Sequence, residues 1–158
     1  MRMTRRLFVA LTLVLAGCIA ENPSLPTYAS AERTLPPPAP GTVRLYFYRL
    51  LDPSDQELGT TVMLNDKPVG FSRNGTVLYR DVAPASYYIS VASRGQYPYQ
   101  FKTVQMQAGQ TWYFRIEPLA SWAGCSGKGD CRGDTFVVEI VDPRQAHVEI
   151  APLGLTSG

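Results

Sequence analysis

Apolar and polar residues alternate with a period of two through most of the chain from Thr42 onwards. Residues 43–48, for example, read Val-Arg-Leu-Tyr-Phe-Tyr, a pattern that is typical of a β-strand. Asn74-Gly75 separates two such segments, and Asn-Gly is a strong signal for a hairpin. Strands are expected near residues 42–51, 60–64, 68–71, 76–82, 87–91, 101–107, 111–116, 135–141 and 147–151. This pattern predicts an all-β fold of about eight antiparallel strands over residues 42–153, a β-sandwich in preference to a small barrel.

The residues before this domain have a different composition. Residues 19–41 carry six prolines, three of them consecutive at 36–38, and almost no large apolar side chains. Such a segment does not build a core, and its prolines favour polyproline II. We therefore predict a disordered tether over residues 18–41, with a reach of roughly 25 Å as a coil to roughly 70 Å when extended.

The first 17 residues have the layout of an export signal. Three arginines precede an uncharged apolar run over residues 7–16, which is too short to span a bilayer as a helix. The run ends in Leu15-Ala16-Gly17-Cys18, which resembles the lipobox of bacterial lipoproteins. The resemblance implies a signal peptide over residues 1–17, cleavage before Cys18, and diacylglycerol on the Cys18 thiol. The alternative is an ordinary secreted protein that is cleaved near Ala20.

The remaining cysteines, Cys125 and Cys131, lie in a glycine-rich segment. An exported protein meets an oxidising environment, so we predict a disulfide between them. A metal site is the competing reading, but it needs about four ligands and His147 is the only histidine. We predict no metal and no cofactor.

The charge of the chain gives no electrostatic case for binding nucleic acid. The sequence has 15 Lys and Arg against 13 Asp and Glu, but three of the arginines belong to the signal. The mature chain is then close to neutral, whereas nucleic-acid-binding domains carry basic patches.

Several segments resemble a family of bacterial lipoprotein domains of unknown function that look like small transthyretin-like and PEGA-type β-sandwiches. The matching segments are residues 43–49, 62–70, 74–76, 82–85 and 107–115. The family usually has Pro-Gly where this chain has Pro84-Ala85. The resemblance implies an immunoglobulin- or transthyretin-like β-sandwich, and it supplies no catalytic residues.

No group of residues in the sequence forms a recognisable catalytic set. His147 and Glu149 alternate on the expected last strand, and a solvated strand face explains them better than catalysis does. Asp130 and Asp134 lack the six to eight oxygen ligands that calcium takes. We therefore predict that the chain is not an enzyme.

Three loop aromatics, Tyr97, Tyr99 and Trp122, are the candidate binding residues, because aromatic side chains combine apolar area with a polar tip. Ile19 follows the lipidated position where Asp would retain an enteric lipoprotein in the inner membrane, so an outer-membrane, periplasm-facing location is expected. The sequence thus predicts a lipid-anchored, non-enzymatic binding or accessory module of the cell envelope, with the membrane as one partner and an envelope protein or peptidoglycan as another. A structural component that bridges membrane and peptidoglycan, or extends an assembly, is the alternative. A glycan-processing enzyme is the weaker one.

Overall fold

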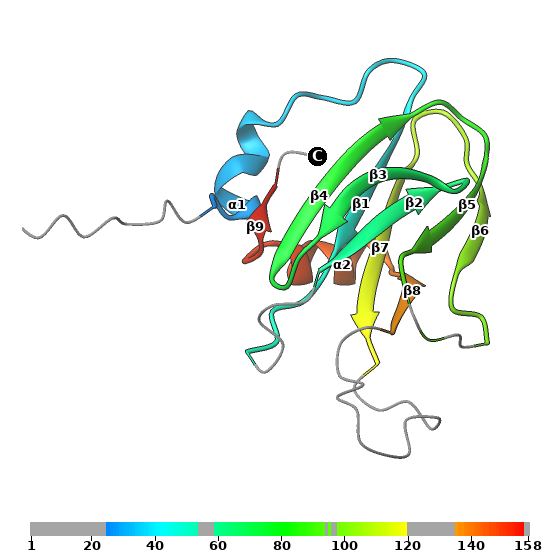
Figure 1. Ribbon diagram of the computed structural model, residues 1–158. Coiled ribbons are helices and arrows are strands. Elements are labelled where there is room, and N and C mark those ends of the chain that lie inside the picture. Colours follow the sequence, from blue (N-terminus) through cyan, green and yellow to red (C-terminus); the bar gives the residue numbers. More distant parts are fainter. Residues whose placement is uncertain (1–24, 54–58, 94, 96–97, 120–134, 157–158) are drawn as a thin grey trace, which may run out of the picture.

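The alternating segments form two sheets in the computed structural model, which describes residues 25–53, 59–93, 95, 98–119 and 135–156 (Figure 1). The five-stranded sheet has the order β8-β7-β1-β4-β9, and the four-stranded sheet has the order β3-β2-β5-β6. The strands are β1 (Val43–Tyr48), β2 (Thr60–Leu64), β3 (Lys67–Ser72), β4 (Thr76–Val82), β5 (Ser86–Val91), β6 (Lys102–Gln105), β7 (Thr111–Pro118), β8 (Phe136–Ile140) and β9 (Gly154–Leu155). Eight of the nine predicted strands are therefore confirmed, with small shifts at their ends.

The prediction of a wholly antiparallel sandwich is wrong for one sheet. The four-stranded sheet is antiparallel, but in the other sheet β1 pairs in parallel with β7, and β4 pairs in parallel with β9. The five-stranded sheet is thus mixed. Alternation along a single strand reports which side chains share a face, and it carries no information on the direction of the neighbouring strand.

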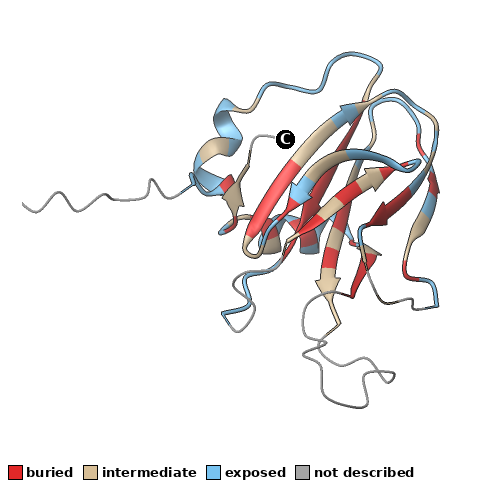
Figure 2. Ribbon diagram, viewed as in Figure 1, coloured by how far each residue is buried: buried red, intermediate tan, exposed pale blue. Residues whose placement is uncertain are grey.

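The main core lies between the two sheets. Val43, Leu45 and Phe47 from β1 point into it, together with Phe114 from β7 and Ile89 from β5. The rings of Phe47 and Phe114 stack with their centroids 5.3 Å apart. Buried residues gather where the two sheets face each other (Figure 2).

A second apolar cluster covers the outer face of the five-stranded sheet. It contains Tyr46 and Tyr48 from β1, Tyr113 from β7, and Tyr28 and Ile150 from outside the sheets. All six residues of β1 are consequently buried, because this central strand is covered on both faces. A sandwich with one solvated outer face would leave these tyrosines half-buried.

The predicted last strand, residues 147–151, is instead the end of helix α2 (Pro143–Ile150). Asp142 caps the helix by accepting a hydrogen bond from the Arg144 amide at 2.9 Å, and Pro143 occupies the first turn. Both are standard helix-start signals. Ala146 and Ile150, four residues apart, are the buried positions, which is helical spacing.

The predicted tether also differs from the structure from Leu25 onwards. Residues 28–31 form the short helix α1 (Tyr28–Ala31), which is followed by the 3-10 turn η1 (Glu32–Thr34). Tyr28 is only 3% exposed, and its amide donates to the Leu153 carbonyl at 2.7 Å. We refer to residues 25–41 as the strap, because they pack against the sheet and the C-terminal segment. Among the described residues, neither helix has the length and apolar character that crossing a membrane requires.

Candidate functional site

Strand β7 extends past the end of its neighbour β8 at one edge of the five-stranded sheet. The β7–β8 ladder begins at the pair Phe114–Ile140, and the Val141 amide makes one more hydrogen bond to the Tyr113 carbonyl at 3.0 Å. The chain then turns away into α2. The backbone N–H and C=O groups of successive residues in a strand point to opposite sides. Those of Thr111 therefore point to the same side as those of Tyr113, toward the position beyond the last residue of β8.

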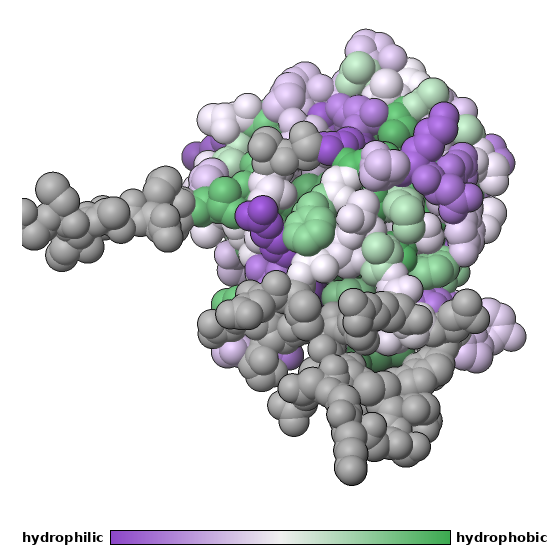
Figure 3. All heavy atoms as spheres, in the orientation of Figure 1, coloured by the Kyte–Doolittle hydropathy of each residue, from purple (hydrophilic) through white to green (hydrophobic). Residues whose placement is uncertain are grey.

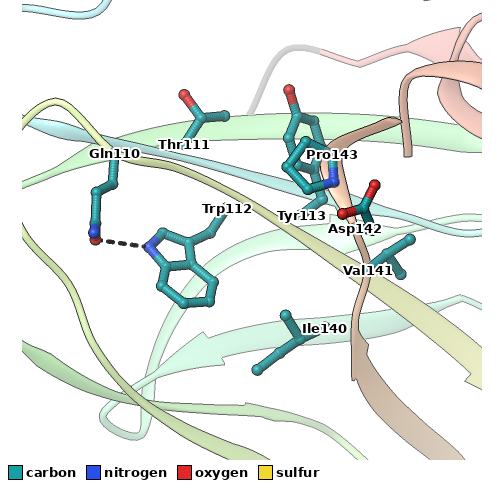
Figure 4. A pocket seen from close by; sticks show the side chains of 8 residues that line it. All are labelled: Gln110, Thr111, Trp112, Tyr113, Ile140, Val141, Asp142 and Pro143. Carbon is teal, nitrogen blue, oxygen red and sulfur yellow. Dashed lines mark hydrogen bonds between the residues drawn. The ribbon is translucent and has the colours of Figure 1, made fainter. Parts of the chain in front are cut away.

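A pocket of about 370 Å³ lies beside β7, beyond the end of β8. We refer to it as the β7 notch (Figure 4). Its wall is mainly apolar, with polar groups from Gln110 and Asp142 at the rim. The lining residues are Gln110, Thr111, Trp112, Tyr113, Ile140, Val141, Asp142 and Pro143. An apolar cleft with a few polar groups is the usual form of a binding site for an apolar group.

The indole of Trp112 is held in place by Gln110. The Gln110 side-chain oxygen accepts from the indole N–H at 3.1 Å and from the Gln107 amide at 2.8 Å. The indole also stacks on Phe114, with ring centroids 6.4 Å apart. The indole surface in the notch is therefore fixed before any ligand arrives, which reduces the entropy lost on binding.

A second pocket of about 250 Å³ lies on the other side of Thr111 and Tyr113, which line both pockets. It is formed by the strap and the outer face of the sheet, and it also contains Tyr28, Glu32, Leu35, Pro36, Pro37, Pro38, Arg44, Tyr46 and His147. Arg44 donates to the Pro36 carbonyl at 2.8 Å and pairs with Asp81 at 2.7 Å. Arg44 thus ties the proline run to the sheet, so this pocket depends on the docked strap.

Three packed tyrosines, Tyr28, Tyr46 and Tyr113, line the second pocket, and Tyr113 also lines the notch. The rings of Tyr46 and Tyr113 stack at 5.2 Å, and the Tyr28 ring meets Tyr46 edge-on at 5.6 Å. The Tyr28 hydroxyl donates to that of Tyr46 at 3.3 Å, and the Tyr113 hydroxyl lies 3.1 Å from Nε2 of His147. The polar ends of the rings are therefore satisfied within the fold, which favours a structural role for them.

Helix α2 is fixed in place by an ionic group around Arg115. The Arg115 guanidinium contacts Glu117, Glu139 and Glu149 at 2.5, 3.0 and 2.9 Å. Glu149 also accepts from the Tyr48 hydroxyl at 2.6 Å. Burial favours the neutral form of Glu149, but the hydrogen bonds and the Arg115 charge outweigh it and lower the pKa of this carboxyl. The last turn of α2 is thereby joined to β7, β8 and β1.

We expect the buried tyrosines to make the protein sensitive to alkali. Burial raises the pKa of Tyr113 to about 12, and it raises the pKa of Tyr28 and Tyr48 still further. As the pH rises, the unfolded chain therefore loses these hydroxyl protons at a lower pH than the folded chain does. The free energy of unfolding should keep its full value below about pH 10. Above that pH it should fall by about 1.4 kcal/mol per pH unit for each such tyrosine.

Phenolate absorbance and far-ultraviolet circular dichroism, followed together during an alkaline titration, check this expectation. The phenolates of these three tyrosines should appear together with the loss of β-structure, and Tyr113→Phe should make the decline in stability less steep. Full ionisation of all nine tyrosines with the fold intact would contradict it.

The structure describes only one of the sequence-predicted site residues. Tyr99 is 90% exposed, with φ of 60°, and its carbonyl accepts from Lys102 at 2.8 Å. Of the residues that the structure describes, those lining the two pockets do not include Tyr99. The lipidation site Cys18, the proposed disulfide Cys125–Cys131, and the aromatics Tyr97 and Trp122 lie outside the described residues, as do Asp130 and Asp134.

The expected placement of His147 and Glu149 on one solvated face of a strand is wrong, because both lie on helix α2. His147 contacts Tyr113, and Glu149 contacts Tyr48 and Arg115. Within the described ranges, no group of three or more His, Cys, Asp or Glu residues lies close enough to hold a metal ion. The geometry that the described residues do provide is that of a binding cleft.

Sequence reasoning did not identify the notch, although one signal for it was present. Trp112 and Tyr113 stand on a predicted strand, and Asp142-Pro143 closes the next one along the chain. Read as a helix start, Asp142-Pro143 would have marked the point where β8 ends. β7 and β8 are consecutive strands, but the register of their pairing, which decides where β8 ends along β7, is provided only by the folded structure.

Comparison with known proteins gives one match. Residues 39–129 match the family described as "Protein of unknown function (DUF2846)". Neither the curated proteins nor the solved structures contain a match to this chain. The matched range covers more than half of the 158 residues and includes β1 to β7, but it ends before β8 and α2. The predicted membership of a domain family of unknown function is confirmed: the chain belongs to the DUF2846 family.

Proposed function

We propose that this protein is a lipid-anchored domain of the bacterial cell envelope that binds an apolar group of a partner protein in the β7 notch. It acts as a non-enzymatic binding or accessory module, facing the periplasm from the outer membrane. The observation that carries the binding role is the notch itself, a preformed apolar cleft of about 370 Å³ beside the part of β7 that extends past its ladder with β8.

The composition of the notch favours a protein side chain or another compact apolar group as its occupant. Trp112, Ile140 and Pro143 offer apolar surface, and Ile140 is 45% exposed. Burial of apolar area contributes about 25 cal/mol per Å². The adjoining backbone of Thr111 can hydrogen-bond to an extended partner segment, which is how sheet edges recruit peptides.

The lipid anchor and the envelope location are supported by the sequence. Basic residues, a short apolar run and Leu15-Ala16-Gly17-Cys18 occur in the order that a lipoprotein signal requires. Two or more acyl chains hold a protein firmly on a bilayer, whereas a single chain binds reversibly. The immunoglobulin- or transthyretin-like class of the sandwich belongs to the same proposal, with two layers of strands as its support.

A charged residue in the notch provides the test. Ile140→Glu places a carboxylate in the apolar wall at an exposed position, so it should leave the fold intact and weaken binding of the apolar dye anilinonaphthalene sulfonate by about tenfold, or about 1.4 kcal/mol. Energy transfer from Trp112 to the dye gives the readout, in a Trp122→Phe background that leaves Trp112 as the only tryptophan.

Val148→Glu is the matched control for this experiment. Val148 is also an exposed apolar residue, 76% accessible, but it lies on α2 and does not line the notch. This variant should bind the dye as the unmodified chain does. Equal dye binding by all three proteins would show that the notch does not receive apolar groups and would refute the binding role.

A further inference from the structure

Three exposed apolar side chains and one arginine gather around the turn between β3 and β4. They are Leu25, Leu51, Phe71 and Arg73, and we refer to them as the turn patch. Leu25, Leu51 and Phe71 are 45%, 68% and 48% exposed. Figure 3 shows green apolar surface with purple polar surface beside it on the side where the described chain begins.

Hydrogen bonds and close packing hold the members of the patch together. The Asn74 side chain accepts from the Asp52 amide at 2.9 Å and donates to the Asp52 carbonyl at 2.7 Å, which fastens the segment carrying Leu51 to the turn. Leu51 also packs so closely on Gly75 that an added Cβ there would lie 3.0 Å from it.

Leu25 and Phe71 reach the same turn from either side of it. Leu25 packs against Gly154, whose amide donates to the Gly75 carbonyl at 3.0 Å. Phe71 lies on β3 with the Arg73 guanidinium 5.8 Å from the centre of its ring. β9, the start of β4 and the beginning of the described chain accordingly lie on one side of the molecule (Figure 1).

The docked strap shortens the distance between the domain and its proposed anchor. Cys18 precedes Leu25 by seven residues, which span at most about 25 Å when fully extended. A free tether over residues 18–41 would reach roughly 70 Å. Because the strap begins at Leu25, beside the turn patch, lipid on Cys18 would hold this patch near the membrane surface.

We infer that the turn patch is a membrane-contacting surface, with the lipid bilayer as its occupant. Leucine and phenylalanine side chains enter the boundary between headgroups and acyl chains, and an arginine beside them can reach lipid phosphate. The domain would then rest on the bilayer in one orientation. This inference rests on the proposed lipid anchor.

A fluorescent label that reports contact with lipid tests the orientation. The full mature chain, residues 18–158, carries Cys18→Ser, Cys125→Ser and Cys131→Ser together with Leu51→Cys, which bears the dye NBD. An N-terminal hexahistidine tag holds it on vesicles of phosphatidylethanolamine, phosphatidylglycerol and a nickel-chelating lipid. Spin-labelled phospholipid should quench this dye about threefold more than the same dye at Thr103→Cys, because contacting residues enter the headgroup region. Thr103 is exposed on β6, at the opposite edge of the four-stranded sheet from β3.

Adding Phe71→Glu should abolish the stronger quenching of the dye at position 51, and adding Val148→Glu should preserve it. Melting followed by circular dichroism confirms that each variant is folded. Equal quenching at positions 51 and 103, or quenching that Phe71→Glu does not change, would overturn the inference. Pairing of labelled chains in solution without vesicles would also overturn it, since the patch would then join two copies. The tag replaces the acyl chains, so these results do not depend on whether Cys18 is lipidated in cells.

Discussion

Replacing Phe114 with alanine is expected to lower the free energy of unfolding by about 3–5 kcal/mol. Phe114 is fully buried at the centre of the main core, between the rings of Phe47 and Trp112. Its removal leaves a cavity that the two sheets cannot close, because both are held by their strand ladders. Since small domains are stable by about 5–15 kcal/mol, this variant should lose a large part of its stability.

Urea unfolding followed by circular dichroism measures this loss. Thr111→Ala is the matched control, because Thr111 lies on the same strand but is exposed, and its substitution should change stability by less than about 0.5 kcal/mol. A loss of under about 1 kcal/mol for Phe114→Ala would mean that the two sheets do not share the core described above.

Replacing Cys18 with serine is expected to abolish the attachment of fatty acids to the protein. A serine hydroxyl does not replace the thiol that accepts diacylglycerol in lipoproteins, and the signal peptide is cleaved only after that step. Cells grown with labelled palmitate should therefore give a labelled mature protein in the membrane fraction for the unmodified chain and none for Cys18→Ser.

Cys125→Ser is the matched control for the lipidation experiment, since it also removes one of the three cysteines but leaves Cys18 unchanged. This variant should keep the label. A mature Cys18→Ser protein that still sediments with membranes would mean that something other than acyl chains holds it there, since those chains provide the proposed attachment.

Local sequence patterns were sufficient to predict most of the strands and some of the turns. β2 and β4 have the predicted bounds, and Gly75 in the predicted Asn74-Gly75 turn has positive φ, although this turn joins two strands of different sheets and is not a hairpin. These features depend on neighbouring residues alone. The parallel pairing of β1 with β7 joins segments far apart in the chain, so no local pattern could reveal it.

Helix α2 and the docked strap, which cover the outer face of the five-stranded sheet, were not predicted, for two physical reasons. Residues 147–151 alternate for only five positions, which does not distinguish a strand from a helix, and tertiary packing of Ala146 and Ile150 decides for the helix. The proline-rich strap reads as a tether because its sequence has few apolar residues. Only one of these apolar residues, Tyr28, is buried, and it packs against Tyr46. Tyr46 belongs to β1, which begins 15 residues further along the chain, so the strap sequence alone does not reveal this contact.

The difference between local sequence patterns and contacts made by strand pairing also explains which parts of the site could be predicted. The sequence pointed to loop aromatics, of which Tyr99 lies on an exposed turn away from both pockets. The notch arises where β8 ends before β7 does, and this depends on strand pairing and on the helix cap at Asp142. Binding surfaces made by the ends of paired elements are visible only once the pairing is known.

Intact mass spectrometry of the mature protein, extracted from membranes, is the most direct test of the lipid anchor on which the envelope role depends. We predict a chain that begins at Cys18 and is heavier than the polypeptide by a diacylglyceryl group, with or without a third acyl chain on its amine. A chain that begins elsewhere, near Ala20 for example, with the mass of the bare polypeptide would contradict the anchor and the membrane orientation derived from it.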